Sequence, residues 1–145
     1  MNRKLRILRW GLAGLLAAAA LVLLLLPPKQ ADLIATFDSS HTQIIALQPK
    51  TTLKLSDTQR VMFAIYDPEV QMVQICIRQP GKQHPATGYR DAAFLVDDVS
   101  CHDIVYAGLD SWLWYHYCAY FLQDVEPFSE LSFTMDGQSI DFTMP

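Results

Sequence analysis

The first pattern along the chain is a long apolar stretch that no charge interrupts. Trp10 to Leu26 form 17 consecutive uncharged residues, mostly leucine and alanine. As a helix with about 1.5 Å rise per residue, this stretch covers about 25 Å, slightly less than a bilayer core of ~30 Å. Pro27 and Pro28 end the helix, because proline supplies no amide donor. The pattern predicts a transmembrane helix in a basic N-terminal segment (1–28), followed by a globular domain (29–145).

The basic residues around this stretch predict its orientation. Four basic residues precede it and only Lys29 follows closely; the four are Arg3, Lys4, Arg6 and Arg9. Positive residues tend to stay on the cytoplasmic side. We therefore expect a single pass through the inner membrane of a bacterium, with the C-terminal domain in the periplasm or extracellular space. A cleaved signal peptide is the alternative, but Lys29 spoils the small-residue pattern before Ala31 and favours an uncleaved anchor.

Beyond residue 28, short runs of alternating apolar and polar residues recur between turn signals. The candidate strands are Leu33–Phe37, Gln43–Leu47, Thr51–Leu55, Arg60–Tyr66 and Gln71–Arg78. Alternation places Val61, Phe63 and Ile65 on one face of their strand. In the next strand the shared face is formed by Val73, Ile75 and Ile77. This density of short strands predicts a mainly β fold, a small antiparallel β-sandwich or barrel-like domain.

The end of the chain predicts a hairpin with a defined register. Asp136-Gly137 is typical of a type I′ turn, in which both central residues have positive φ. A two-residue loop pairs Met135 with Gln138, and it places one set of apolar side chains on a common face. This set is Leu131, Phe133, Ile140 and Phe142. Turn chemistry and alternation agree on the register, which favours a well-specified hairpin.

The segment Asp110–Gln123 allows two interpretations. Its aromatic density and the preceding Ile104-Val105-Tyr106 run favour a strand. A helix over about 110–123 is the alternative, because Asp110 could cap it and the apolar residues include helical spacings. The helix would make the domain α+β rather than mainly β.

Three cysteines are present, Cys76, Cys101 and Cys118. If Gly108–Ser111 is a four-residue hairpin loop, Cys101 lies opposite Cys118. Directly opposed residues at a non-hydrogen-bonded site are close enough for a disulfide. An exported domain resides in an oxidising compartment, so this register predicts a Cys101–Cys118 disulfide with Cys76 left over.

The same register places Asp103 opposite His116, and this suggests two kinds of chemistry. A Cys-His-Asp cluster could activate a thiol, but a sulfur in a disulfide cannot act as a nucleophile. Cys101, His102, His116 and Cys118 also form a donor set that suits zinc or copper. Adjacent strand residues point to opposite faces, so Cys101 and His102 do not easily share one ion. We therefore expect no metal site and no cofactor.

The net charge of the chain excludes some classes of function without indicating a particular one. The chain has a net charge of -4 and a pI of about 5.4. All 15 acidic residues lie beyond residue 28, where 7 of the 11 basic residues remain, giving -8. This balance argues against a nucleic-acid binder. The acidic groups Asp97-Asp98, Asp103, Asp124 and Glu126 lack the spacing of a calcium loop and are expected to be solvated surface.

These observations favour a membrane-anchored, non-enzymatic interaction or assembly module of the bacterial envelope. Its partner would be another envelope protein, bound through a surface or a sheet edge. One alternative is a metal- or thiol-active envelope protein that uses Cys101, His102, His116 and Cys118. Another is a small periplasmic inhibitor or immunity protein, which differs from the first hypothesis only in its partner.

Overall fold

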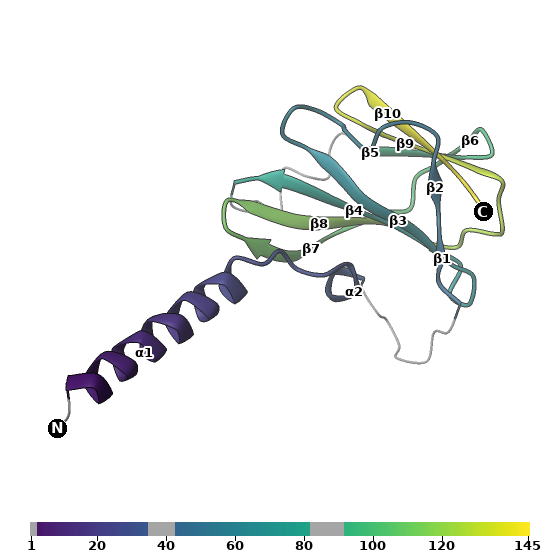
Figure 1. The fold of residues 1–145 in the computed structure, drawn as a ribbon. Helices are drawn as coiled ribbons and strands as arrows, with labels where there is room; N and C mark the ends of the chain where they lie inside the picture. The colour runs from purple at the N-terminus through teal and green to yellow at the C-terminus, as the bar shows by residue number, and fades with distance from the viewer. Residues whose placement is uncertain (1–2, 35–42, 82–91) are drawn as a thin grey trace.

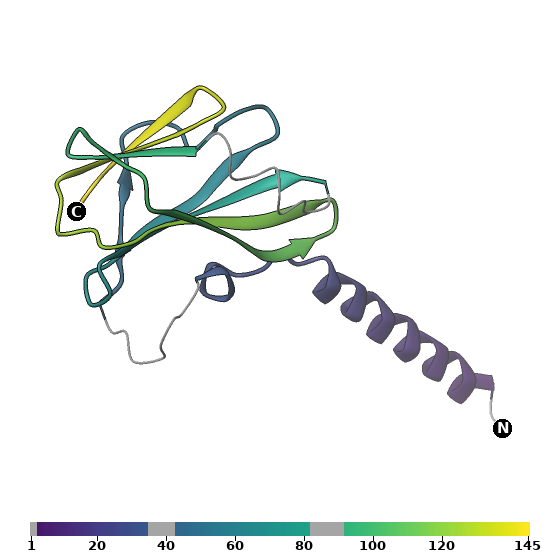
Figure 2. The same cartoon turned by 180° about the vertical axis from the view of Figure 1, so that it is seen from behind.

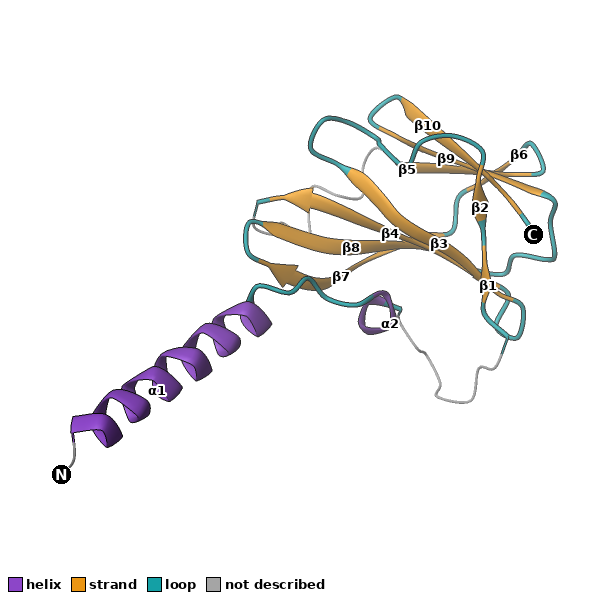
Figure 3. Ribbon diagram, viewed as in Figure 1, coloured by secondary structure: helices purple, strands orange, loops and turns teal. Residues whose placement is uncertain are grey.

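The structure is a computed structural model that describes residues 3–34, 43–81 and 92–145 (Figure 1). Within these ranges the chain forms two helices followed by strands that build a sandwich (Figure 3). The helices are α1 (Arg3–Leu24) and α2 (Gln30–Leu33). The strands are β1 (Ile45–Ala46), β2 (Gln48–Pro49), β3 (Arg60–Asp67), β4 (Met72–Pro80), β5 (Ala92–Val96), β6 (Val99–Cys101), β7 (Ile104–Trp112), β8 (Tyr115–Leu122), β9 (Glu130–Met135) and β10 (Gln138–Thr143).

Helix α1 projects away from the sandwich, as both views show (Figures 1 and 2). Its described leucines are exposed around the helix, with Leu12 61% and Leu16 60% accessible. In the part of the chain whose side chains are described, no helix is long and apolar enough to cross a membrane. The helix forms where the sequence predicts one, and its membrane-spanning role stays a prediction.

The sandwich consists of two antiparallel sheets of five strands each. The first sheet has the order β1-β3-β4-β8-β7, and the second has the order β2-β10-β9-β5-β6. This architecture confirms the mainly β antiparallel fold. The hydrophobic core lies between the sheets, where the Tyr120 ring of the first meets the Phe133 ring of the second at 5.6 Å between centroids.

The C-terminal hairpin has the predicted register. Asp136 and Gly137 have φ of 51° and 75°, as a type I′ turn requires. Phe133 lies opposite Ile140, and Leu131 lies opposite Phe142. All four apolar side chains are buried in the core between the sheets. Local turn chemistry and side-chain alternation are sufficient to specify this hairpin.

Strand β3 departs from the predicted alternation because it contains a bulge. Val61 lies opposite Ile77 but Phe63 lies opposite Cys76, so Met62 is an extra residue in the ladder. An extra residue shifts every later side chain to the other face. Val61 therefore faces the core between the sheets, whereas Phe63 and Ile65 face outward. The prediction that these three residues share one face is wrong.

The outward-facing side of the first sheet is also apolar, and α2 lies on it. Leu33, which is 2% exposed, packs in one cluster with Phe63, Ile65, Cys76 and Tyr117. The Gln74 side chain on the same face donates a hydrogen bond from Nε2 to the Leu33 carbonyl (2.9 Å). These contacts fasten the start of the globular domain to the sheet.

The weaker strand predictions at the start of the domain are only partly confirmed. Leu33 ends α2 instead of beginning a strand, and residues 35–37 lie outside the described residues. The predicted strand Gln43–Leu47 shortens to β1. Thr51–Leu55 forms only an isolated bridge between Lys54 and Arg60. Leu33, Ile45 and Leu53 nevertheless pack against the sandwich, so their apolar character reflects burial rather than a paired strand.

Asp110–Gln123 is extended, as predicted, and the helical alternative is wrong. Strands β7 and β8 meet at a two-residue loop, Leu113-Trp114, with Trp112 opposite Tyr115. The predicted four-residue loop Gly108–Ser111 is incorrect, because β7 continues through these residues to Trp112. A second bulge between Gly108 and Asp110 shifts the ladder once more. Cys118 therefore lies opposite Gly108.

Candidate functional site

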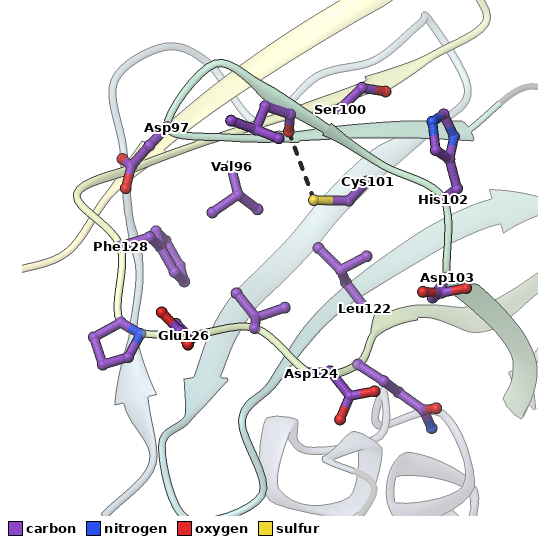
Figure 4. A pocket seen from close by; sticks show the side chains of 14 residues that line it. Val96, Asp97, Ser100, Cys101, His102, Asp103, Leu122, Asp124, Glu126 and Phe128 are labelled. Carbon is purple, nitrogen blue, oxygen red and sulfur yellow. Dashed lines mark hydrogen bonds between the residues drawn. The ribbon is translucent and has the colours of Figure 1, made fainter.

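A pocket of about 530 Å³ opens at one end of the sandwich, between the two sheets. It lies at the C-terminal ends of β5 and β8, beside the residues Cys101–Asp103 that lead from β6 to β7 (Figure 4). Val96, Leu122 and Phe128 occupy its middle, and acidic side chains surround them. The acidic residues that line it are Asp97, Asp103, Asp124 and Glu126. No lysine or arginine is among the described residues that line it, so this part of the pocket combines an apolar floor with a negative rim.

Asp97 holds the pocket wall in place. It lies with Asp98 in the tight turn between β5 and β6, where the two residues have φ of 46° and 66°. Its carboxylate accepts hydrogen bonds from the backbone amides of Ser129 (3.0 Å) and Glu130 (2.9 Å). These bonds tie the turn to the start of β9. Asp97 therefore has a structural role, because its carboxylate is already bound by these two backbone amides.

The other three carboxylates give the pocket its electrostatic character. Within the described residues, no lysine or arginine forms an ion pair with Asp103, Asp124 or Glu126. The charge of Glu126 also acts on Tyr66, whose hydroxyl donates to the Val125 carbonyl (2.8 Å). Burial raises the pKa of Tyr66, and the charges of Asp67 and Glu126 raise it further. The pocket is thus suited to a cationic group that neutralises this excess negative charge.

Cys101 and His102 line the pocket but do not act together. Cys101 is half-buried opposite Phe94, and its thiol donates to the Val99 carbonyl at 3.6 Å. The His102 ring points away from the Cys101 sulfur (Figure 4). Among the described residues, no group of three histidine, cysteine or acidic side chains is arranged to hold a metal ion. These positions supply shape and polarity to the pocket.

Cys118 lies elsewhere in the sandwich. It precedes the pocket residue Leu122 by four positions along β8, which corresponds to about 13 Å. Burial raises the pKa of the Cys118 thiol to about 11, against a smaller lowering by a hydrogen bond with Tyr106. Burial also raises the pKa of Cys76 to about 12. All three cysteines are free, so the predicted Cys101–Cys118 disulfide is not found. Cys101 lies opposite Phe94 in the second sheet, whereas Cys118 lies opposite Gly108 in the first.

His116 is part of a buried polar network at the opposite end of the sandwich. It lies opposite Ser111 and Gln79, so the predicted pairing with Asp103 is wrong. Its Nδ1 donates to the Gly81 carbonyl (2.9 Å), and its Nε2 accepts from Gln79 Nε2 (2.8 Å). Both ring nitrogens are occupied, which leaves His116 no free donor atom for a metal ion.

The predicted reactive cluster is thus divided between two ends of the molecule, and the pocket was missed. A usable signal was present: Asp97-Asp98, Asp103 and Asp124 all lie at strand ends. In an antiparallel sheet, the end of one strand and the start of the next share an edge. Tracing the strand directions would have gathered these carboxylates at one end.

Comparison with protein-family models, curated proteins and solved structures found no match for this chain. The function is therefore inferred from the pocket, the helix and their arrangement.

Proposed function

We propose that this chain is a membrane-anchored, non-enzymatic interaction or assembly module of the bacterial envelope. The observation that carries the proposal is α1. From Trp10 onward its described side chains are apolar and exposed on all sides, including Leu15 at 68% and Leu23 at 68%. A helix that is apolar all round requires an apolar environment. The basic residues in the N-terminal turns of α1 favour a cytoplasmic N-terminus, which puts the sandwich on the periplasmic side.

The tether between α1 and the sandwich supports this arrangement. Only five residues, 25–29, separate the end of α1 from α2. Docking of α2 on the first sheet then holds the sandwich near the end of α1. The acidic pocket lies at the end of the sandwich away from α1 (Figures 1 and 2). In this arrangement the pocket faces the periplasm, where a partner protein can approach it.

The chemistry of the pocket indicates the kind of partner. Its apolar floor suits an aliphatic or aromatic side chain, and its unpaired carboxylates suit a lysine or arginine beside it. A basic, partly apolar segment of another envelope protein combines both features. Charge complementarity of this kind increases association rate and specificity. Binding should therefore weaken as salt concentration rises.

Crosslinking from the full-length chain in cells tests the proposal. A photoreactive amino acid at Val99, which is 66% exposed at the pocket, should capture one stoichiometric partner that also copurifies in mild detergent. The same probe at Gln138, at the other end of the second sheet, is the control. Asp103→Asn/Asp124→Asn should reduce capture, whereas Asp57→Asn outside the pocket should not. A chain that is always recovered alone would contradict the proposal.

Topology is tested separately. A reporter that is active only in the cytoplasm, fused after Pro145, should stay silent. A strong signal would reverse the proposed orientation. The intact mass of the mature protein shows whether the anchor is retained. Loss of roughly 30 N-terminal residues would identify a cleaved signal peptide instead.

A further inference from the structure

The loop between β7 and β8 exposes two large apolar side chains. Leu113 is 51% exposed and Trp114 is 77% exposed, and together they form the whole loop. The Trp114 carbonyl accepts a hydrogen bond from the Gly81 amide (2.8 Å), which ties the loop to the end of β4. The tip is therefore held in position while its side chains face outward. A fixed, exposed tryptophan at a hairpin tip suggests a surface that buries it.

Basic side chains lie directly behind this tip. Arg60 and Arg78 are opposite each other in the β3–β4 ladder, and like charges in this arrangement destabilise a sheet. The Arg78 guanidinium lies 4.6 Å from the centroid of the Tyr115 ring, and Tyr115 stacks on Trp112. Arg78 Nε is buried without a hydrogen-bond partner among the described residues. The two arginines thus retain capacity for an anion.

A second pocket, of about 360 Å³, brings these arginines together with Lys54. Among the described residues that line it, Asp57 is the only acidic one, and it pairs with Lys54 (2.7 Å). Arg60 and Arg78 are left as the uncompensated charges of the pocket. Guanidinium groups bind phosphate oxygens through paired hydrogen bonds. The pocket is therefore suited to a phosphate group.

The two ends of the sandwich differ in charge. The end opposite the hairpin tip bears the acidic residues Asp67, Glu69, Asp97, Asp98, Asp103, Asp124 and Glu126. The tip end faces the side from which α1 projects (Figures 1 and 2). From Leu24 to Gln30 the chain spans at most about 20 Å, and Trp112 packs in the same outer-face cluster as Leu33. The aromatic and basic end is therefore held close to the base of the helix.

We infer that this end of the sandwich docks on the phospholipid surface of the membrane that holds α1. Leu113 and Trp114 enter the interfacial layer, where tryptophan is preferred, and Arg60 and Arg78 bind lipid phosphates. The acidic end is repelled by the same surface and points away from it. This inference rests on the proposed membrane anchoring and adds a fixed orientation of the sandwich.

Tryptophan fluorescence of the full-length chain in vesicles tests the docking. The chain has three tryptophans, so Trp10→Phe/Trp112→Phe leaves Trp114 as the only emitter. In vesicles of phosphatidylcholine and phosphatidylglycerol, lipids brominated near the headgroup should quench Trp114 at least threefold more than a tryptophan at the acidic end. The matched control places that tryptophan by Val99→Trp in a chain whose native tryptophans are all phenylalanine. Circular dichroism checks that both variants are folded.

The arginines provide the second arm of the experiment. Arg60→Gln/Arg78→Gln should reduce quenching of Trp114 by half or more, whereas Lys50→Gln, which removes a base at the other end, should not. If the chain floats with the vesicles but Trp114 is not quenched, the docking is overturned and the anchoring stands. If the chain does not float with the vesicles, the proposed function fails, and the docking fails with it.

Discussion

Truncation of Leu33 to alanine should release α2 from the first sheet and make Cys76 reactive. Leu33 packs over the outward-facing side of that sheet in the same cluster as Cys76, which is 0% exposed. Burial raises the pKa of the Cys76 thiol to about 12, so the closed form contains little thiolate near neutral pH. Cys76 therefore reacts only after α2 opens, and the rate of the thiol reaction measures the population of the open form.

The size of the effect follows from the burial of Leu33. Replacing a buried leucine with alanine costs about 2–5 kcal/mol, and the low part of that range applies because α2 is a single turn at the surface. A loss of about 2–3 kcal/mol increases the open population by roughly 30- to 150-fold. When closing is faster than the chemical reaction, the rate at Cys76 increases by the same factor.

The assay measures reaction with Ellman's reagent at pH 8 in a Cys101→Ser background, and peptide mapping identifies the modified site. Cys118, on the other face of the sheet, is the internal control and should remain slow. Val99→Ala, a truncation at an exposed site, should leave both rates unchanged. An unchanged Cys76 rate in Leu33→Ala would refute the covering role of α2. Equal acceleration at Cys118 would indicate general unfolding instead.

Three further predictions concern buried groups. Tyr66→Phe leaves the Val125 carbonyl without its donor and should lower the free energy of unfolding by about 1–2 kcal/mol in urea denaturation. The thiols of Cys76 and Cys118 have an ordinary pKa near 9.0 when unfolded and about 12 and 11 when folded, so stability should fall as pH rises above about 9. A Cys76→Ala/Cys118→Ala variant should show a shallower decline. Denatured, unreduced protein should contain three free thiols, and a linked Cys101–Cys118 peptide would refute the observed register.

Elements specified by neighbouring residues were predictable from the sequence. The C-terminal hairpin is the clearest case, because Asp136 and Gly137 adopt positive φ at low cost and the flanking alternation fixes the same register. The face shared by Val73, Ile75 and Ile77 was also correct, since β4 has no bulge within it. Where backbone chemistry and side-chain burial give the same answer locally, no tertiary information is needed.

The errors have two sources, extra residues within strands and a misplaced turn. Met62 and Leu109 each add one residue to a strand, and the pattern of apolar positions does not mark either insertion. The β7–β8 turn lies at Leu113-Trp114 rather than at Gly108–Ser111, and this displacement changes the partners of Cys118 and His116. The missed pocket has a simpler cause. Asp103 precedes β7 and Asp124 follows β8, and the antiparallel pairing of these two strands brings both residues to one end.

The apolar outer side of the first sheet makes the N-terminal segment part of the folding unit. A chain shortened by its first 34 residues would expose Phe63, Ile65 and Tyr117 together, and exposed apolar patches of this kind promote self-association. Synthesis from the N-terminus avoids this hazard, because the covering turn leaves the ribosome before any strand that it protects. Each strand of the first sheet therefore forms with its cover already attached to the same chain.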